Sequence, residues 1–202
     1  MFTGIIEEVG ILKETRPEAR SLKVVVQSKL PLDEIKIGDS ICVEGMCLSC
    51  VGKDPTNKTF TVDAVGETVK RTTLSTWHKG RKLNLERALP ATGRFDGHFV
   101  SGHVDCQGRV ARIVNQGRQF NLAVNFPAEY RKFIAPKGSI TVNGVSLTVA
   151  EITGCRFTVA VIPLTVRETT LQYLRPGEPV NIEVDLIARY IANFLSNNLE
   201  TR

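Results

Sequence analysis

Short runs of β-branched and alternating hydrophobic residues recur along the chain and predict β-strands. The runs are brief, and Gly, Pro and Asp turns separate them. Good examples are residues 22–27, 40–44, 60–63, 120–125 and 157–161. The dipeptides Glu44-Gly45 and Asn143-Gly144 each lie between two such runs and indicate tight hairpin turns. Many strands with closely spaced turns favour a barrel or a sandwich.

Helical periodicity is confined to a few segments. Short helices are expected after Thr68, after Thr165 and over residues 127–133, where a proline suits the first turn. The tail predicts an amphipathic helix, because its hydrophobic residues recur every three to four positions. Its hydrophobic stripe consists of Ile187, Tyr190, Ile191, Phe194, Leu195 and Leu199. Packing on its own barrel and contact with another subunit both explain this stripe.

The chain contains an internal duplication. Residues 61–86 match residues 158–183, with shared Thr-Val, Thr-Thr-Leu and Asn-x-Glu elements. Two upstream blocks match as well, 38–49 with 137–148 and 3–7 with 101–105. Two copies are too few for a solenoid, so the sequence predicts a duplicated domain with a linker near residues 88–97. The prediction is an all-β protein with barrels at 1–97 and 98–186, followed by an amphipathic helix at 187–202.

Composition and charge exclude several classes of protein. Lys and Arg total 26 against 21 Asp and Glu, and the net charge of +5 is spread along a chain with only 6% aromatic residues. No basic stripe or stacking platform is visible, so nucleic acid is not an expected partner. No membrane segment or signal peptide is predicted. Five cysteines, an odd number, indicate a reduced, cytoplasmic protein rather than a secreted disulfide framework.

Three cysteines have the spacing of an iron–sulfur site. Cys42, Cys47 and Cys50 follow a C-x4-C-x2-C pattern, which requires a fourth cysteine further on. The second copy carries Thr141 and Ser146 in place of the first two, so the shared architecture does not require sulfur. We therefore expect no metal site.

Small polar side chains recur after the hairpin glycine in both copies. Cys47 and Ser49 in the first copy correspond to Ser146 and Thr148 in the second. Residues two apart share one side of a strand, so each pair presents two small polar groups to a ligand. A flat polar molecule fits such a surface. The alternative is that Cys47 is a small residue filling the barrel interior.

Histidines offer the candidate proton-transfer group. His78 lies in a polar turn and is expected to be solvated. His98 and His103 are five apart, which on a strand directs them to opposite faces and disfavours a shared metal. His103 replaces Ile5 of the first copy, and an imidazole titrates near neutral pH.

Four motifs carry a resemblance to a known family. They are MFTGI at 1–5, GHFVSGHV at 97–104, NGVSLTV at 143–149 and NIEVD at 181–185. In this order and spacing they resemble the riboflavin synthase alpha-chain family over essentially the whole chain. The resemblance implies two Greek-key barrels per chain and homotrimers joined through the C-terminal helices. It places the site between the N-terminal barrel of one subunit and the C-terminal barrel of its neighbour.

The resemblance also implies a reaction. Family members convert two molecules of 6,7-dimethyl-8-ribityllumazine into riboflavin and 5-amino-6-(D-ribitylamino)uracil, the last step of riboflavin biosynthesis. A four-carbon unit moves between the two molecules, and neither a metal nor an organic cofactor takes part. The duplication then has a chemical reason, since each copy holds one of two identical substrates and orients it toward the other. Some relatives associate with a lumazine synthase capsid, for which the sequence offers no marker.

Specific residues are implied for each role. His103 and Ser146 are expected near deprotonation of the substrate methyl group, and Cys47 or Ser40 near the acceptor molecule. The full implied catalytic set is His103, Ser146, Cys47, Thr148, Ser40 and Asp185. The implied substrate-binding set is Gly4, Ile5, Ile6, Cys47, Leu48, Ser49, Asp63, Ala64, Val65, Gly66, Glu67, Thr68, Gly102, His103, Val104, Lys137, Ser146, Leu147, Thr148, Ala160, Val161, Ile162, Pro163, Leu164 and Thr165.

Three positions depart from the family pattern, and one alternative function remains. Met46 stands where relatives often have a second cysteine, and Asn143 stands where aspartate is common. Glu44 precedes the hairpin glycine, where relatives have other polar residues. Asn143 cannot act as an anionic base. The alternative is a non-catalytic lumazine- or flavin-binding antenna protein. A flavin-dependent oxidoreductase would need a nicotinamide domain, for which no residues are left.

Overall fold

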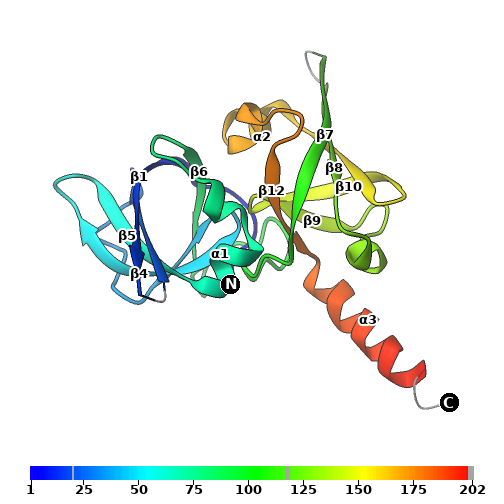
Figure 1. The fold of residues 1–202 in the computed structure, drawn as a ribbon, viewed down its shortest axis with the longest axis horizontal. Coiled ribbons are helices and arrows are strands. Elements are labelled where there is room, and N and C mark those ends of the chain that lie inside the picture. Colours follow the sequence, from blue (N-terminus) through cyan, green and yellow to red (C-terminus); the bar gives the residue numbers. More distant parts are fainter. Residues whose placement is uncertain (20, 117–118, 200–202) are drawn as a thin grey trace.

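The computed structural model describes residues 1–19, 21–116 and 119–199 (Figure 1). Residues 200–202 of the predicted tail lie outside the described part. The described chain forms two closed β-barrels side by side and a helix that follows them. This arrangement confirms the predicted duplicated all-β architecture.

The first barrel is a Greek key of antiparallel strands. Its strands lie in the order β1-β2-β5-β4-β3-β6, so β2 pairs with β5 rather than with its successor. Closure joins β1 to β6 and leaves no open sheet edge. Its strands are β1 (Glu8–Glu18), β2 (Ser21–Gln27), β3 (Ser40–Val43), β4 (Met46–Asp54), β5 (Thr59–Val65) and β6 (Lys82–Arg87).

The second barrel repeats the same topology. Read from its first strand, the order is β7-β8-β11-β10-β9-β12, equivalent strand for strand to the first barrel. Its strands are β7 (Cys106–Gln116), β8 (Gln119–Asn125), β9 (Ser139–Val142), β10 (Val145–Thr153), β11 (Arg156–Val161) and β12 (Pro179–Val184). The helical segments are α1 (Gly66–Arg71), η1 (Thr73–Thr76), η2 (Ala128–Phe133), α2 (Pro163–Arg167), η3 (Thr170–Tyr173) and α3 (Leu186–Leu199).

The two predicted hairpin turns are present and meet between the barrels. Glu44 and Gly45 have φ of 50° and 85°, and Asn143 and Gly144 have φ of 51° and 80°. Two successive positive φ values are the mark of a type I′ turn. A Cβ on Gly45 would lie 2.8 Å from the Gly144 nitrogen. Glycine is therefore required at position 45 both by the close approach of the two turns and by its positive φ.

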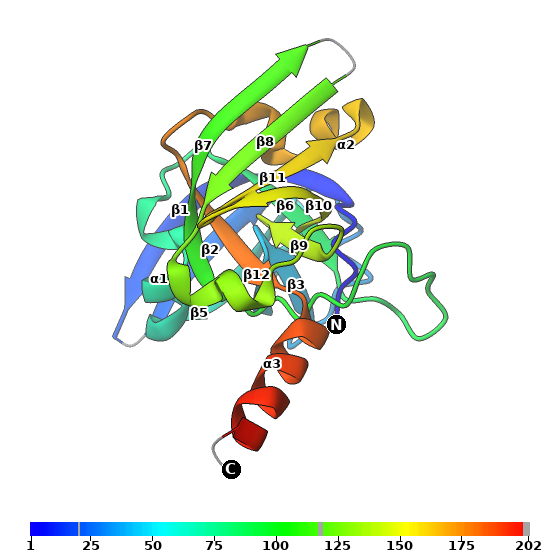
Figure 2. The same ribbon diagram turned by 90° about the vertical axis from the view of Figure 1, so that its right-hand side faces the viewer.

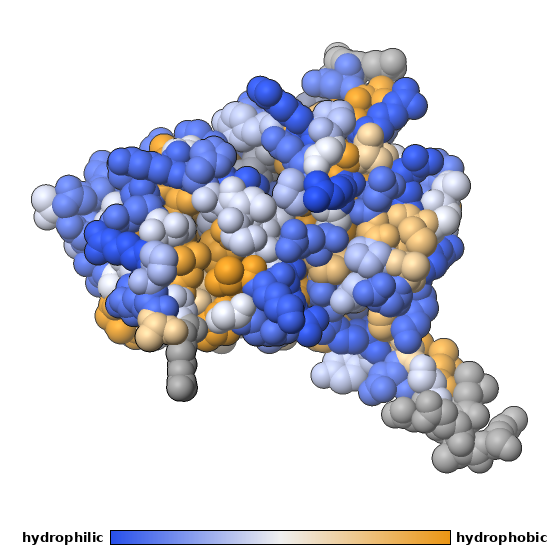
Figure 3. Space-filling view, viewed as in Figure 1, coloured by the Kyte–Doolittle hydropathy of each residue, from blue (hydrophilic) through white to orange (hydrophobic). Residues whose placement is uncertain are grey.

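Helix positions differ in part from the prediction. Helices α1 and α2 begin before Thr68 and Thr165 rather than after them, because each starts directly where its strand ends. Helix α3 projects away from both barrels (Figure 2). Its side chains Ile187, Tyr190 and Ile191 are each more than half exposed, so the stripe does not pack on its own barrel. Hydrophobic surface is visible along α3 in Figure 3. No helix within the described residues is long and apolar enough to cross a membrane.

Two equivalent asparagines join the barrels. The Asn84 Nδ2 donates to the Asn143 carbonyl at 2.9 Å, and its Oδ1 accepts from the Thr170 amide at 2.7 Å. Asn181 makes the equivalent pair of bonds back to the first barrel, both at 2.8 Å. All of these groups are buried. Because an unmade buried hydrogen bond is costly, these contacts fix how the barrels sit against each other.

Glu44 adds a titratable group to this interface. Its Oε1 accepts from the Asn84 amide at 2.7 Å and from the Thr170 hydroxyl at 3.0 Å. Its Oε2 is buried without a hydrogen-bond partner among the described residues. Burial raises the pKa of this carboxyl to about 7, against the lowering influence of those two bonds and of Arg81. Asn143 is its uncharged counterpart in the second copy.

Glu44 is expected to make the protein less stable as the pH rises toward neutrality. The pKa of the folded state lies above the ordinary value of 4.5, so the folded state favours the protonated carboxyl. The free energy of unfolding that the protonated Glu44 carboxyl contributes is fully present below about pH 4.5. It is lost as the pH rises through about 7. Between these values, the unfolding free energy of the wild type should fall by up to about 3 kcal/mol relative to a Glu44→Gln variant.

Denaturant unfolding at several pH values measures this difference. Glu151→Gln, at an exposed position, serves as the control and should follow the wild type. Parallel pH dependence in the wild type and in Glu44→Gln would show that Glu44 does not titrate in this range.

Candidate active sites

The segment that precedes each barrel crosses to the other barrel. We call residues 2–6 the first strap and residues 100–104 the second strap. Phe2 and Val100 pair in both directions, with N–O distances of 2.8 and 3.2 Å. Beyond this pairing, Ile6 packs against the core of the second barrel and Val104 against the core of the first. Each barrel is therefore completed by chain from the other half.

Each strap is fixed to the position just after the hairpin turn. The Cys47 amide donates to the Gly102 carbonyl, and the Ser146 amide donates to the Gly4 carbonyl, both at 2.8 Å. Gly102 and Gly4 have φ of 79° and 77°. A Cβ on Gly102 would lie 2.5 Å from the Cys47 Cβ, and one on Gly4 would lie 2.7 Å from the Ser146 Cβ. Only glycine permits so close an approach.

The first site lies on the outer face of the N-terminal barrel. Cys47 and Ser49 point outward from β4, while the residues between and after them are buried. The alternative that Cys47 fills the barrel interior is therefore wrong. Beside it is a shallow cavity of about 170 Å³. It is lined by Met46, Cys47, Glu67, Thr68, Arg71, Thr72, Gly102, His103 and Val104, which brings together six of the predicted site residues.

The second site has the equivalent framework on the C-terminal barrel. Ser146 and Thr148 point outward from β10, and Gly4 of the first strap lies against Ser146. The predicted residues 160–165 end β11 and begin α2, as residues 63–68 end β5 and begin α1. Lys137 precedes β9 with a φ of 66°, a strained angle for a lysine, and its amide donates to the Val149 carbonyl at 2.7 Å.

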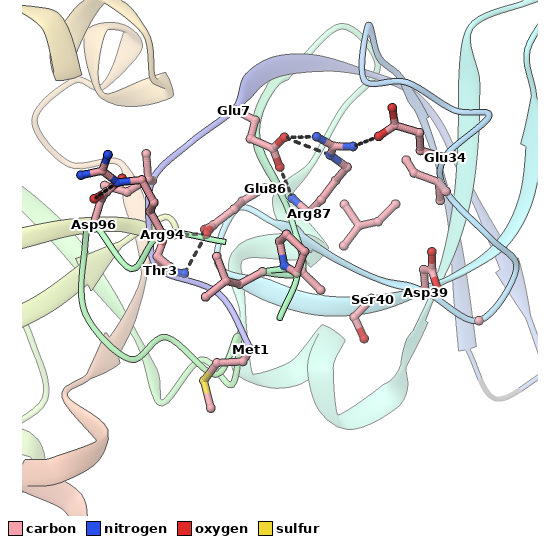
Figure 4. A pocket seen from close by; sticks show the side chains of 17 residues that line it. Met1, Thr3, Glu7, Glu34, Asp39, Ser40, Glu86, Arg87, Arg94 and Asp96 are labelled. Atoms are coloured by element: carbon pink, nitrogen blue, oxygen red, sulfur yellow. Dashed lines mark hydrogen bonds and ion pairs between the residues drawn. The ribbon is translucent and has the colours of Figure 1, made fainter. Parts of the chain in front are cut away.

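Ser40 lies in a different cavity from Cys47. A larger cavity of about 720 Å³ opens between β3, β6, the first strap and the linker, and Ser40 lines it together with Thr3 and Ile5 (Figure 4). Arg87 lies at this cavity between the carboxylates of Glu7 and Glu34. Ser40 is therefore not among the residues that surround Cys47.

The histidines are distributed differently from the prediction. Residues 98–104 form no strand, so the strand-based argument on the two histidines does not apply. His103 lines the cavity beside Cys47, because the second strap carries it to the first barrel. Within one chain His103 therefore lies beside Cys47 and not beside Ser146. His98, to which the sequence assigned no catalytic role, has its Nδ1 2.7 Å from the Ser146 Oγ.

The three closely spaced cysteines do not converge. Cys50 is buried in the core of the first barrel, whereas Cys42 and Cys47 lie outside it against Phe2 and Val100. Burial raises the pKa of the Cys42 thiol well above its ordinary value. This arrangement gives no support to an iron–sulfur interpretation.

His98 shares a hydrogen bond with Ser146, in which a neutral imidazole can serve as the acceptor. Burial lowers the pKa of its imidazole, and the nearby Asp185 carboxylate opposes that effect without cancelling it. The ring is therefore neutral at neutral pH and has a free lone pair for hydrogen bonding. Its Nε2 is buried and has no partner within the described residues. The sequence signal for His98 was its place in the GHFVSGHV motif, of which it is the second residue.

The His98 imidazole is expected to titrate below the ordinary value of 6.5. An Asp185→Asn variant should lower its pKa further, because it removes a carboxylate that favours the charged ring. NMR titration of the imidazole protons measures both values. Asp33→Asn, an exposed change on the other barrel, is the control and should leave His98 unchanged. A rise in the His98 pKa in Asp185→Asn would contradict the assignment.

Comparisons of sequence identify relatives along the full chain. Residues 3–88 and 101–185 each match the lumazine binding domain family model. The riboflavin synthase of Bacillus subtilis (strain 168) is 41% identical over 202 residues, covering 100% of this chain and 93% of that protein. The riboflavin synthase of Photobacterium phosphoreum is 42% identical over 196 residues, covering 96% and 89% respectively.

Solved structures share the fold. The crystal structure of LumP complexed with 6,7-dimethyl-8-(1'-D-ribityl) lumazine has a TM-score of 0.82 at 22% identity. The crystal structure of LumP complexed with riboflavin has a TM-score of 0.82 at 24% identity. Both comparisons cover 91% of this chain and 99% of the other. Two lumazine binding domains, and identity above 40% across almost the whole length of two relatives, show that this chain belongs to the riboflavin synthase family.

Proposed function

We propose that the protein is an enzyme that moves a four-carbon unit between two 6,7-dimethyl-8-ribityllumazine molecules, giving riboflavin and 5-amino-6-(D-ribitylamino)uracil. The observation that carries this proposal is the pair of equivalent sites, each with small polar groups on a strand and a strap across it. A reaction of two identical molecules needs two such sites. Holding both substrates in the reacting orientation supplies a large part of the rate enhancement.

The second site is suited to deprotonation. The C7 methyl group of the lumazine is acidic, because its carbanion delocalises into the ring. Ser146 and neutral His98 form a hydroxyl–imidazole pair at 2.7 Å, in which the Ser146 hydroxyl gives its proton to the ring nitrogen as its oxygen takes the proton of the methyl group. Asp185 favours the imidazolium that results. Thr148 lies two residues on, on the same outward face.

The first site is suited to the acceptor molecule. Cys47 faces the cavity from β4, His103 faces it from the second strap, and Thr68 faces it from α1. In this site the thiol is the group placed to add at C7 of the second lumazine, and His103 is placed to exchange the proton. Ser40 lines another cavity, so Cys47 is the better candidate for this step.

Turnover tests the proposal directly. Purified protein incubated with 6,7-dimethyl-8-ribityllumazine should form one riboflavin for every two lumazine molecules consumed, followed by absorbance or by chromatography. A His98→Gln variant should lower kcat by about 100-fold, because it removes the proton acceptor for Ser146.

The controls separate catalysis from simple binding. His78→Gln alters an exposed histidine that does not line the cavity beside Cys47. This variant should form riboflavin at the wild-type rate. Stoichiometric binding of lumazine without riboflavin formation would favour the antenna-type function. Full activity in His98→Gln would remove His98 from the mechanism.

We further propose that copies of the chain form a homotrimer through α3. The support is its exposed apolar face, in which Ile187, Tyr190, Ile191 and Leu195 recur at helical spacing. Exposed hydrophobic stripes of this kind mark subunit contacts. A site between neighbouring subunits would let the first site of one copy face the second site of the next.

Sedimentation velocity tests the role of α3. Ile191→Glu places a charge in the apolar stripe and should convert the trimer to monomers. Asn193→Glu introduces the same charge at an exposed polar position of the same helix and should leave the trimer intact. Unchanged sedimentation of Ile191→Glu, or a wild type that sediments as a monomer, would contradict the assignment.

A cytoplasmic location completes the proposal. All five cysteines are free, and Cys42, Cys50 and Cys106 are buried thiols. Burial raises the pKa of the Cys106 thiol to about 12, which keeps it in the unreactive form. Such a set of thiols is typical of proteins in a reducing compartment.

A further inference from the structure

Glu183 holds the second strap in place through hydrogen bonds to its carboxylate. This residue of β12 is almost fully buried. Its Oε1 accepts from the Ser101 amide at 2.7 Å and from the Ser101 hydroxyl at 2.6 Å, and its Oε2 accepts from the Gly102 amide at 3.0 Å. The Ser101 oxygen in turn accepts from the His103 amide at 3.2 Å. One carboxylate thus orders three successive strap residues.

Glu86 holds the first strap in the same manner. This residue of β6 is 4% exposed. Its Oε1 accepts from the Thr3 amide at 2.7 Å and from the Thr3 hydroxyl at 3.0 Å, and its Oε2 accepts from the Gly4 amide at 3.0 Å. Figure 4 shows its side chain directed toward Thr3. The two carboxylates occupy equivalent strands, so both copies keep this device.

The straps carry the effect to the opposite barrel. Glu183 belongs to the second barrel, yet the Gly102 that it holds accepts the amide of Cys47 in the first. Glu86 belongs to the first barrel, yet the Gly4 that it holds accepts the amide of Ser146 in the second. We propose that Glu86 and Glu183 are positioning residues, each of which sets the geometry of the active site on the opposite barrel.

Only a carboxylate suits this role. Each strap presents three donors to two oxygens, and an ionised carboxylate accepts at both oxygens and donates at neither. A glutamine would turn an N–H toward the strap amides and would leave buried donors unpaired. Burial raises the pKa of both carboxyls, while the strap donors lower it. The donors therefore favour the ionised form that accepts them.

Hydrogen exchange, measured without any substrate, tests whether each glutamate affects the opposite barrel. We call that outcome the crossed pattern. In Glu183→Gln the Cys47 amide should exchange at least about tenfold faster while the Ser146 amide stays protected, and Glu86→Gln should give the reverse. Peptides covering residues 46–50 and 145–149 report the two amides. A general loss of stability would instead raise exchange in both.

Glu8→Gln is the matched control. Glu8 also accepts two backbone amides and a hydroxyl, from Lys29, Leu30 and Ser28, but that segment reaches neither site. Glu8→Gln should leave both reporter amides unchanged. Faster exchange in the same barrel as the substitution, equal changes in both barrels, or no change in either would overturn the proposal.

Milder variants cover the case in which a glutamine variant fails to fold. Ser101→Ala and Thr3→Val each remove only the hydroxyl that reaches a carboxylate, at 2.6 and 3.0 Å. They should show the same crossed pattern with a smaller change, and the opposite pattern or none would refute the proposal.

Riboflavin binding provides the functional readout, and this part rests on the proposed function. Glu86→Gln should weaken ligand-induced protection at 145–149 only, and Glu183→Gln at 46–50 only. If wild-type protein makes no riboflavin and binds none, the proposed function fails while the exchange result for the straps still stands.

Discussion

The hydrogen bond from the Cys47 amide to the Gly102 carbonyl, with its counterpart between Ser146 and Gly4, holds the two halves of the chain in one functional arrangement. These bonds bring the strap of one half against the outward strand face of the other. The bonds require glycine at two positions, because any Cβ would overlap the facing strand. They also require that the chain before each barrel cross to the other.

Crossing makes the duplication more than a doubling of one binding site. Each site contains a strand from one copy and a strap from the other, so neither half forms a site alone. The copies have also diverged where the chemistry must differ. Cys47 corresponds to Ser146, and His103 corresponds to Ile5. On the proposed function, two identical substrates meet two different sets of groups, one as donor and one as acceptor.

Much of the fold was predictable because it depends on local patterns. Strands at 40–44 and 157–161 follow from short hydrophobic runs, and the Asn143-Gly144 turn follows from the positive φ that its residues tolerate. Alternation placed Cys47 and Ser49 on one side of a strand, and the structure shows that this side faces outward. These features are encoded within a few residues of one another.

The crossed straps were not predictable, because they depend on contacts between residues about 55 and 140 positions apart. The sequence therefore did not show that His103 lies beside Cys47 within one chain, and it assigned no catalytic role to His98. The roles of Glu86 and Glu183 were hidden for the same reason. Both belong to the Asn-x-Glu element that the two copies share, and only the fold shows what they hold.

The most direct test of the account is hydrogen exchange of the full-length protein with and without riboflavin. Two sites built from both halves predict protection at residues 46–49 together with 102–104, and at 145–148 together with 4–6. Protection confined to the strands, with the straps unaffected, would contradict the crossed construction. Protection in one barrel only would contradict the claim of paired sites.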